Sequence, residues 1–322
     1  MTRPSVVFVA PFDDAQHAHN AQRGRALERL GCDVTAVNMV ERRGPLGLFR
    51  SKDHRTRLEE AIRAAAPDLV LVAGAPELDA DTVESLQGIS KAKWVNWFPH
   101  DLRGCYDAIT VASAYDRVWA AGSDLAGKLA EAVNHEVEVL PLAADPSVYR
   151  PLRTRDQQYR ANVVFAGTAT PRREALLAQL VEFGLAIWGA GWRRTSLRDY
   201  CRGEQVRTEE FVRAYAGASV AVNIHHRLDE DEVEATCNQR LFEIAAIGVL
   251  QVVDYRLDLD RWFAPDEEVL VFDTPADLKH TVENALQDLA AGERIAAAAR
   301  ERLLAEHTYM HRMEKILADL QS

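Results

Sequence analysis

Short apolar runs alternate along the chain with longer segments whose apolar residues recur at helical spacing. The run at residues 5–10 reads SVVFVA and is almost wholly apolar, which is typical of a parallel strand covered on both faces. The same reasoning predicts strands at residues 33–37, 68–73, 93–98, 108–112, 117–120 and 137–140, and helices at residues 21–30 and 58–65. Strand, helix and strand in alternation form the βαβ pattern, so the right-handed crossover rule implies an open parallel sheet.

A segment with three prolines and no hydrophobic period, PLAADPSVYRPL at residues 141–152, interrupts this alternation. We predict that it links two domains, residues 1–145 and 146–322. Beyond it the pattern predicts strands at 162–166, 185–188, 219–224, 249–253 and 269–272, helices at 172–183, 209–216 and 238–247, and a helical C-terminal part from residue 276. Thr208 is the expected cap of the 209–216 helix. The fold class is therefore α/β, with two Rossmann-like domains whose parallel sheets face a cleft, and ligands bind beyond the carboxyl ends of such strands.

Composition narrows the class of protein. A chain of 322 residues with 48% hydrophobic residues can bury two ordinary domains, and a net charge of −11 argues against a protein that works by gripping nucleic acid. The four cysteines lie far apart without CxxC spacing, which favours a reducing cytoplasm and disfavours a zinc module. No apolar run approaches the roughly 18 residues of a membrane span. We expect a cytoplasmic protein without a transmembrane segment; the oligomeric state is not predicted.

Glu243 is an acid in a helix that is otherwise apolar on almost every side. The segment NQRLFEIAAIG runs from Asn238 to Gly248, and the glycine is a typical helix stop. A buried carboxylate needs a partner, because burying an unpaired one costs several kcal/mol. Two interpretations stay open: an intrahelical ion pair with Arg240, or a ligand diol whose two hydroxyls face the carboxylate oxygens.

Two arginines stand where the helix dipole disfavours them. VVFAGTATPRRE places Gly167 after a strand, and Arg172 and Arg173 in the first turn of the following helix. An anion at that helix end, such as a diphosphate, would resolve the mismatch, whereas an exposed arginine pair could also stand without a ligand. Gly189 belongs to a G-x-G pattern in IWGAGW, for which a tight turn is the alternative to a nucleotide contact.

Polar residues also follow other predicted strands. His225 and His226 come at the carboxyl end of the strand AVNI, where a ligand would lie. His100 and Asp101 follow KWVNWFP and are either a catalytic or sugar-contacting pair or the start of a polar loop. The acidic string LDEDEVE at 228–234 indicates a solvated loop, and no His, Asp and Glu set has metal-ligand spacing. We therefore predict no metal site.

The second half resembles a known family of enzymes. LPLAADPSVYRP, VVFAGTATPRR, RTEEFVRAYAGASVAVNIHH, NQRLFEIAAIG and HTYMHR occur in an order and spacing similar to those of GT-B glycosyltransferases, and most similar to the CgeB-like, spore-maturation type of group 1. The first half matches more loosely, chiefly through VNWFPHD. This resemblance implies a C-terminal helix that returns to the first domain.

The resemblance also implies roles for residues. A nucleotide-sugar donor, with UDP- or dTDP-sugar favoured, would bind the second domain as a co-substrate, and no other cofactor is expected. Glu243 would hold the ribose hydroxyls, Gly167 with Arg172 or Arg173 would face the diphosphate, and Asn238 and Arg240 would shape the pocket, together with Gly189 and His225. His100 or Asp101 would contact the reacting sugar or an acceptor, which could be a small molecule, a glycan or a protein bound by the first domain.

The resemblance implies a metal-independent reaction of the hexosyltransferase type that retains the anomeric configuration of the sugar. One departure concerns the sugar site: many retaining relatives carry a glutamate eight residues before the ribose-binding one, and Ala235 stands there, with Glu232 and Glu234 out of register. Two alternatives stay open. A nucleotide-sugar epimerase of the same fold needs no acceptor, and a structural protein could bind the nucleotide without turnover.

Overall fold

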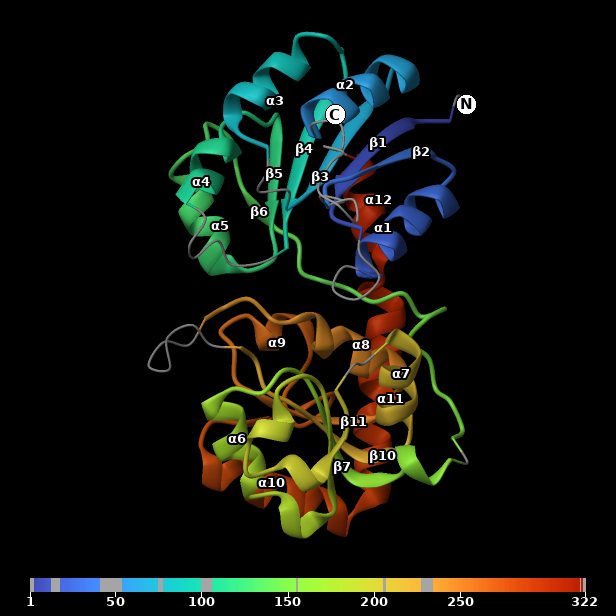
Figure 1. The fold of residues 1–322 in the computed structure, drawn as a ribbon, viewed down its shortest axis with the longest axis vertical. Helices are drawn as coiled ribbons and strands as arrows, with labels where there is room; N and C mark the ends of the chain where they lie inside the picture. Colours follow the sequence, from blue (N-terminus) through green and yellow to red (C-terminus); the bar gives the residue numbers. More distant parts are fainter. Residues whose placement is uncertain are drawn as a thin grey trace, which may run out of the picture. The chain divides into compact units, whose positions relative to one another are not determined.

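The structure of the chain is a computed structural model that describes residues 3–12, 18–40, 54–74, 78–99, 106–154, 156–204, 207–226, 234–318 and 320. The chain divides into two compact units. Unit 1 comprises Met1–Leu142 and Tyr309–Ser322, and unit 2 comprises Ala143–Thr308. The boundary after Leu142 falls inside the proline-containing segment at residues 141–152, and the last helix of the chain belongs to unit 1 (Figure 1).

Unit 1 is built on a six-stranded parallel sheet in the order β2-β1-β3-β4-β5-β6. Its strands are β1 (Ser5–Ala10), β2 (Asp33–Asn38), β3 (Leu69–Ala73), β4 (Lys93–Phe98), β5 (Arg117–Ala120) and β6 (Glu138–Val139). Its helices are α1 (Ala18–Arg29), α2 (His54–Ala65), α3 (Ala80–Gln87), α4 (Tyr106–Ala112), α5 (Ser123–Ala130) and α12 (Tyr309–Ala318). The predicted parallel sheet is confirmed.

Successive side chains of the unit 1 strands point to opposite faces of the sheet. Val7 and Val9 join a core with apolar residues of α2, α3, α4 and α5. Phe8 lies on the other face, where the Cβ position of Gly24 in α1 is 3.7 Å from its ring. Figure 1 shows α12, in red, beside α1, in blue. The sheet is thus covered by helices on both faces, as its continuously apolar strands predict.

A buried arginine joins the helices of the α1 face to the sheet. Arg23 is fully buried, and its guanidinium lies 4.3 Å from the ring centre of Trp97 in β4 and 5.5 Å from that of Tyr309 in α12. Its Nη1 donates to Asn20 Oδ1 at 2.6 Å. These contacts tie three elements of unit 1 together, two of them at opposite ends of the sequence.

One predicted element of unit 1 is wrong. The run AITVA was predicted as a strand at residues 108–112, but it belongs to helix α4 (Tyr106–Ala112). β4 and β5 are parallel neighbours, and parallel strands must be joined by a crossover on a face of the sheet, for which a helix is the usual solution. Val111 and Ala112 face the core while Ile109 is 38% exposed, so tertiary context overrides the β propensity of this run.

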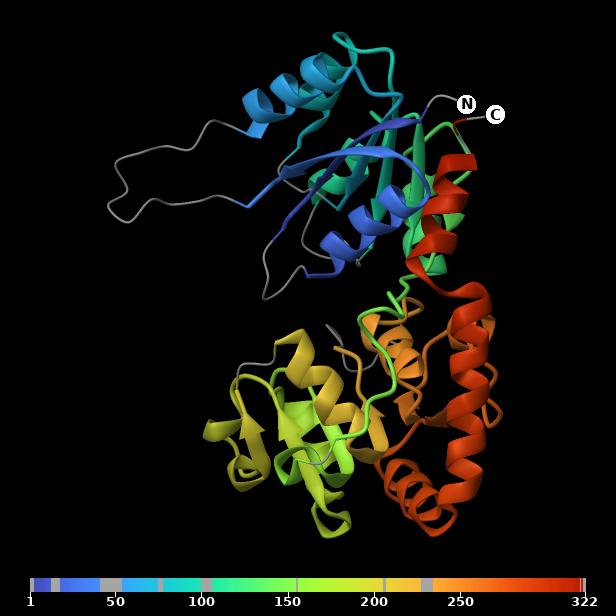
Figure 2. The same cartoon turned by 90° about the vertical axis from the view of Figure 1, so that its right-hand side faces the viewer.

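Unit 2 repeats the architecture with a parallel sheet in the order β12-β11-β10-β7-β8-β9. Its strands are β7 (Ala161–Ala166), β8 (Leu185–Trp188), β9 (Cys201–Gly203), β10 (Ala218–Asn223), β11 (Leu250–Asp254) and β12 (Leu270–Phe272). Its helices are α6 (Pro171–Ala178), α7 (Thr208–Ala216), α8 (Gln239–Ile247), α9 (Leu259–Trp262), α10 (Pro275–Gln287) and α11 (Leu289–Glu306). Figure 2 shows α11 running along one side of this unit.

Helix ends in unit 2 follow the expected capping chemistry with one correction. Thr170 caps α6 through a hydrogen bond from Arg173 N, and Gly248 ends α8 in the left-handed conformation. Thr208 was expected to cap α7, but the helix already includes it and Arg207 is the cap residue. Across the described parts of the chain, no helix is long and apolar enough to cross a membrane.

Candidate functional site

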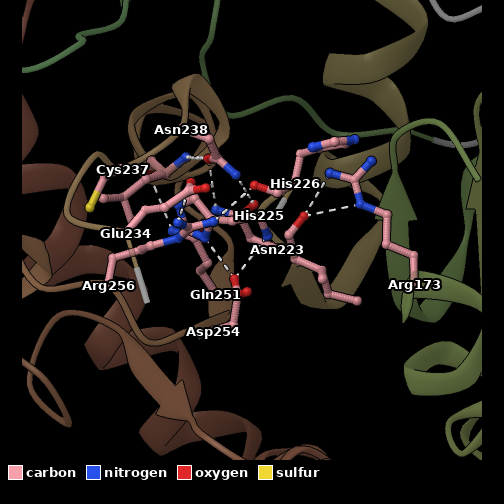
Figure 3. A network of polar contacts seen from close by, with 12 residues as sticks. Arg173, Asn223, His225, His226, Glu234, Cys237, Asn238, Gln251, Asp254 and Arg256 are labelled. Atoms are coloured by element: carbon pink, nitrogen blue, oxygen red, sulfur yellow. Dashed lines mark hydrogen bonds and ion pairs between the residues drawn. The ribbon is translucent and has the colours of Figure 1, made fainter. Parts of the chain in front are cut away.

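The carboxyl ends of three neighbouring strands form the edge of the unit 2 sheet on which polar groups gather. β7, β10 and β11 lie side by side and end at Ala166, Asn223 and Asp254. Because they are parallel, their carboxyl ends lie at one edge. The residues that follow these strands, and the first turns of α6 and α8, supply the polar side chains, which Figure 3 shows in part.

Both arginines at the start of α6 turn toward the end of β10. Arg173 donates from Nε and Nη2 to Ile224 O at 3.2 and 2.8 Å, and from Nη1 to Thr168 O at 2.9 Å. Arg172 donates from Nη1 to His225 O at 3.3 Å and from Nη2 to Asp254 Oδ2 at 2.9 Å. The charge mismatch with the helix dipole is thus relieved in part by protein groups: a carboxylate for Arg172 and carbonyl oxygens for Arg173.

Asp254 is the centre of this cluster (Figure 3). Its Oδ1 accepts hydrogen bonds from His225 N at 2.8 Å and pairs with His225 Nδ1 at 2.6 Å. Burial by itself would raise the pKa of Asp254, but the His225 donors and the Arg172 guanidinium hold this pKa well below its usual range. Burial lowers the pKa of His225, which Asp254 opposes. An ionised Asp254 therefore holds a neutral His225 with Nδ1 as the donor.

A second network of three buried or half-buried amides fixes the start of α8 (Figure 3). Asn223 and Asn238 exchange two hydrogen bonds, at 3.1 and 2.8 Å, and Asn223 Nδ2 also donates to Gln251 Oε1 at 2.9 Å. Asn238 Oδ1 accepts from Leu241 N, which makes Asn238 the N-cap of α8. The helix that carries Glu243 is therefore held to β10 and β11 by side-chain amides.

Glu243 lies inside unit 2 with its side chain only 3% exposed, as the sequence predicted. Its Oε2 accepts from Arg240 Nη1 at 2.5 Å, so the intrahelical pair is present. The guanidinium of Arg240 also lies 4.0 Å from the ring centre of Phe211 in α7. The pair does not decide between the two interpretations, because an arginine that neutralises Glu243 leaves carboxylate lone pairs for a further donor.

Tyr215 in α7 lies within electrostatic range of both Arg173 and the Arg240–Glu243 pair. Its hydroxyl accepts from Ala166 N at 3.0 Å, just before Gly167. Burial raises the pKa of Tyr215 to about 12, and Arg240, Glu243 and Arg173 all act on it electrostatically. Glu243 and Arg173, which come from different helices, therefore belong to one electrostatic neighbourhood.

Gly167 and Gly189 lie where the ends of β7 and β8 meet. A Cβ on Gly189 would lie 2.1 Å from Gly167 O, and Gly189 has a φ of +136°. Gly167 O also accepts from Trp192 Nε1 at 2.7 Å. The close approach of the two backbones explains the glycine at 189 by itself, in agreement with the tight-turn interpretation.

The structure gives Glu234 and Ala235 definite places. Glu234 Oε2 accepts from Arg256 Nη1 at 2.7 Å, and both side chains are largely buried. Arg256 also donates from Nη2 to His226 O at 3.0 Å (Figure 3). Ala235 is 1% exposed. The position eight residues before Glu243 is therefore apolar and buried, and the adjacent carboxylate is engaged by an arginine.

Some predicted residues lie outside the described part of the chain. His100 and Asp101, proposed for catalysis, are among them, as is Glu232. Gly167, Arg172, Arg173, His225, Asn238, Arg240 and Glu243 all lie within unit 2 around the ends of β7 and β10 and the start of α8. Over the residues that the structure describes, no group of three or more His, Cys, Asp or Glu side chains could hold a metal ion.

Sequence reasoning missed Asp254, Asn223, Gln251, Arg256 and Tyr215. Three of them had a signal: Asp254 and Asn223 are the polar last residues of apolar strands, and Gln251 interrupts the apolar run LQVVD. Polar groups at strand ends were used to select His225, and the same rule selects Asp254 and Asn223, whereas the signal at Gln251 is a polar residue within an apolar strand. Arg256 and Tyr215 had no such signal, because their roles depend on burial and on partners that are distant in sequence.

Comparison with known proteins relates most of unit 2 to a known family. Residues 172–318 match the model of a family described as Glycosyl transferase-like, a match that covers less than half of the chain. No curated protein matches the sequence.

Solved structures similar to the whole chain include several glycosyltransferases. They include sucrose-phosphate synthase from Thermosynechococcus elongatus (TM-score 0.73, 14% identity, 99% of each chain covered). A structure of Anabaena Alr3699/HepE in complex with UDP and glucose has a TM-score of 0.68 at 12% identity and covers 99% of this chain and 100% of that one. An alpha-glucosyltransferase in complex with UDP has a TM-score of 0.72 at 10% identity, with 99% of each chain covered. The chain thus has the fold of the GT-B glycosyltransferases, and most of its second unit matches the Glycosyl transferase-like family.

Proposed function

We propose that the protein is a glycosyltransferase that moves a sugar from a nucleoside-diphosphate sugar to an acceptor hydroxyl. The observation that carries the proposal is the pairing of two features in unit 2: the arginine-bearing N-terminus of α6 and the buried carboxylate of Glu243 in α8, which both act on Tyr215. The first suits a diphosphate and the second suits a ribose diol. A nucleotide presents these two groups next to each other.

In this proposal the chain's own residues divide the donor between them. Arg172, Arg173 and the backbone N–H of Arg172 bind the diphosphate and stabilise the negative charge that develops on it as the bond to the sugar breaks. Glu243 accepts hydrogen bonds from the ribose hydroxyls, and Asn238 and Arg240 hold its helix and carboxylate in place. Because arginines supply the positive charge, we infer a metal-independent reaction.

The finer assignments are also proposals. UDP- or dTDP-sugar is the favoured donor. Two points support UDP: the solved complexes of similar fold with UDP, and the ribose diol proposed for Glu243, since the deoxyribose of dTDP has no 2′-hydroxyl. Retention of the anomeric configuration, a hexosyl group, the CgeB-like relationship and a cytoplasmic location stay predictions, as do His100 and Asp101 as the residues that contact the reacting sugar or acceptor. The acceptor is a small molecule, a glycan or a protein.

One observation favours a second candidate, a protein that binds nucleotide sugars without turnover. The position eight residues before Glu243 is the buried Ala235, and the neighbouring Glu234 is engaged by Arg256. Unit 2 therefore offers no carboxylate at this position for the donor sugar. A nucleotide-binding protein and a transferase both need the diphosphate and ribose contacts, so the two differ only in turnover.

Thermal shifts test the proposal directly. We expect one of UDP, GDP, dTDP, ADP and CDP, with UDP or dTDP first, to raise the melting temperature equally with and without a divalent metal. A ligand at 100 times its dissociation constant stabilises the folded state by about 2.7 kcal/mol, which a melting curve resolves. If none of the five nucleotides changes the melting temperature, the donor site is wrong. If UDP or dTDP binds but the corresponding nucleotide sugar is neither hydrolysed nor transferred, the result favours a protein that binds nucleotide sugars without turnover.

The role of Glu243 is tested by combining a substitution of Glu243 with a nucleotide that has no 2′-hydroxyl. Wild-type protein should bind UDP about tenfold more tightly than 2′-deoxy-UDP, because a hydrogen bond to a charged group contributes about 1.5 kcal/mol or more. Glu243→Gln, which keeps the size of the side chain, should bind the two nucleotides with nearly equal affinity. Glu234→Gln is the matched control and should keep the wild-type preference. Undiminished preference in Glu243→Gln would mean that Glu243 serves only its pair with Arg240.

A further inference from the structure

Asp254 is a buried carboxylate that accepts hydrogen bonds from the guanidinium of Arg172 and from His225. The residue is 1% exposed, yet its carboxylate accepts three hydrogen bonds. Oδ2 accepts from Arg172 Nη2, and Oδ1 accepts from the backbone N and the ring of His225. The carboxylate comes from the end of β11, whereas the arginine comes from the first turn of α6. It therefore connects a strand end to a helix start across the sheet edge.

Asp254 also acts on Arg172 through the backbone. By accepting His225 N, it fixes the peptide groups that follow β10. Two carbonyl oxygens of this segment accept from the arginines: His225 O from Arg172 and Ile224 O from Arg173. One carboxylate thus holds the guanidinium of Arg172 directly and helps to hold the acceptors of both arginines.

An arginine needs such support to bind a diphosphate in one geometry. Its side chain has several rotatable bonds and loses roughly 2 kcal/mol of rotamer entropy when fixed. The contacts with Asp254 and His225 occupy one N–H on each terminal nitrogen, whereas the guanidinium carries five. The side chain is 18% exposed, so part of the fork faces solvent at the N-terminus of α6. Because both terminal nitrogens are held, the plane of the guanidinium is fixed, and with it the direction of the remaining N–H donors.

We propose that Asp254 is a positioning residue for the diphosphate of the donor: it fixes the guanidinium of Arg172, and the strand-end carbonyls that receive both arginines, in the arrangement that binds the two phosphates. The inference rests on the proposed function of unit 2. It adds a residue that touches no substrate atom and acts through Arg172.

A purely neutralising role for Asp254 predicts the opposite effect of its removal on diphosphate affinity. If Asp254 only neutralised Arg172, its carboxylate would repel a diphosphate, and removing the charge would strengthen binding. If it positions Arg172, removing the charge weakens binding although the site becomes more positive. Asp254→Asn separates the two, because asparagine keeps the size of the side chain but has one acceptor oxygen for the donors of His225 and Arg172.

The experiment measures dissociation constants for UDP and for uridine by titration calorimetry on the full chain. We expect Asp254→Asn to weaken UDP binding about tenfold, as loss of one charge-assisted hydrogen bond does, and to leave uridine binding within about twofold. Asp258→Asn is the matched control, because Asp258 is an equally buried carboxylate in unit 2 that pairs with Arg261 at 3.1 Å. It should bind UDP as the wild type does.

Two further variants keep the test independent of the stability of Asp254→Asn. Arg172→Lys keeps the charge but has no planar fork, and should weaken UDP binding to a similar extent. In an Arg172→Ala background, Asp254→Asn should have a smaller effect on UDP binding than in the wild type, because Arg172 is gone and only the support of Arg173 through the strand-end carbonyls is left to lose.

The outcomes are distinct. Tighter or unchanged UDP binding by a folded Asp254→Asn protein overturns the inference and leaves the proposed function standing. Equal losses for UDP and uridine also overturn it, because they indicate general damage to unit 2. If the wild-type protein binds another of the five nucleotides in place of UDP, the same comparison is made with that nucleotide and its nucleoside. If it binds none of them, the proposed function is overturned and this inference with it.

Discussion

At the scale of single residues, His225 is a group whose protonation differs between the folded and the unfolded chain. It is 2% exposed, and the charged groups that act on it are Asp254, Arg256 and Arg173, none of which changes charge near neutral pH. Burial lowers its pKa in the folded state below the ordinary value of about 6.5. The unfolded chain therefore takes up a proton at this residue at a higher pH than the folded chain does.

The sign of the pH dependence follows. The neutral form of His225 favours folding fully above pH about 6.5, and this contribution is lost as the pH falls through the folded pKa. We expect the melting temperature of wild-type protein to fall more steeply between pH 7.5 and pH 5, a range of about 2.5 pH units, than that of His225→Asn, which keeps a side-chain N–H for Asp254 but does not titrate. Parallel curves for the two proteins would contradict a buried neutral His225.

The sequence identifies site residues when their chemistry conflicts with their local setting. Glu243 in an apolar helix and arginines at a helix N-terminus are such conflicts, and the structure gives both of them partners. Asp254 is the polar last residue of an apolar strand, which marks it as a group at the ligand edge of the sheet but does not reveal its partners. Its importance comes from Arg172, which lies 82 positions away in sequence, and no spacing rule reaches that far.

At the scale of elements, α8 is positioned by its cap rather than by propensity. Asn238 accepts from Leu241 N and exchanges two amide hydrogen bonds with Asn223. We expect Asn238→Ala to lower the free energy of unfolding by about 2 kcal/mol or more, about 1 from the lost cap and the rest from the two hydrogen bonds that the buried Asn223 amide loses. Asn238→Asp keeps the cap oxygen and should lose less.

Urea denaturation of the full chain measures these differences, with Asn284→Ala as an exposed control that should change stability by less than about 0.5 kcal/mol. If Asn238→Ala matches that control, the amide network does not hold α8. The same comparison bears on function, because a displaced α8 moves Glu243 and should weaken UDP binding in Asn238→Ala more than in Asn238→Asp.

Elements were predictable wherever hydrophobic period and burial agree. The strands covered on both faces, such as β1 and β4, coincide with the predicted residues 5–10 and 93–98. The 108–112 run was predicted as a strand because it is short, apolar and β-branched, and such a run cannot be distinguished from a buried helix by period alone. Only the pairing of β4 with β5, which leaves no room in the sheet order for another strand, decides for a helix.

At the scale of the whole molecule, the chain leaves unit 1 after Leu142 and returns to it at Tyr309. The return helix α12 is anchored to the segment by which the chain leaves unit 1: Arg312 donates from Nε to Pro141 O at 2.8 Å and from Nη2 to Leu142 O at 3.1 Å. Tyr309, Met313 and Ile316 are buried in unit 1. A C-terminal helix that returns to the first domain, implied by the family resemblance, is therefore confirmed, although its partners could not be read from local sequence.

Removal of residues 309–322 tests whether α12 stabilises unit 1 and whether unit 2 binds the nucleotide without it. Each buried large apolar side chain of α12 contributes roughly 1.5–3 kcal/mol, which together is comparable with the whole stability of an ordinary domain, so unit 1 should lose its hydrogen-exchange protection in α1 and β4. The proposed donor site lies within Ala143–Thr308, so protection in β7, β10 and α8 and the affinity for UDP should persist. A shorter truncation that removes only residues 319–322 leaves α12 intact and should change neither. Loss of UDP binding with protection of unit 2 preserved would show that the donor site requires unit 1, and would contradict the assignment of nucleotide binding to unit 2 alone.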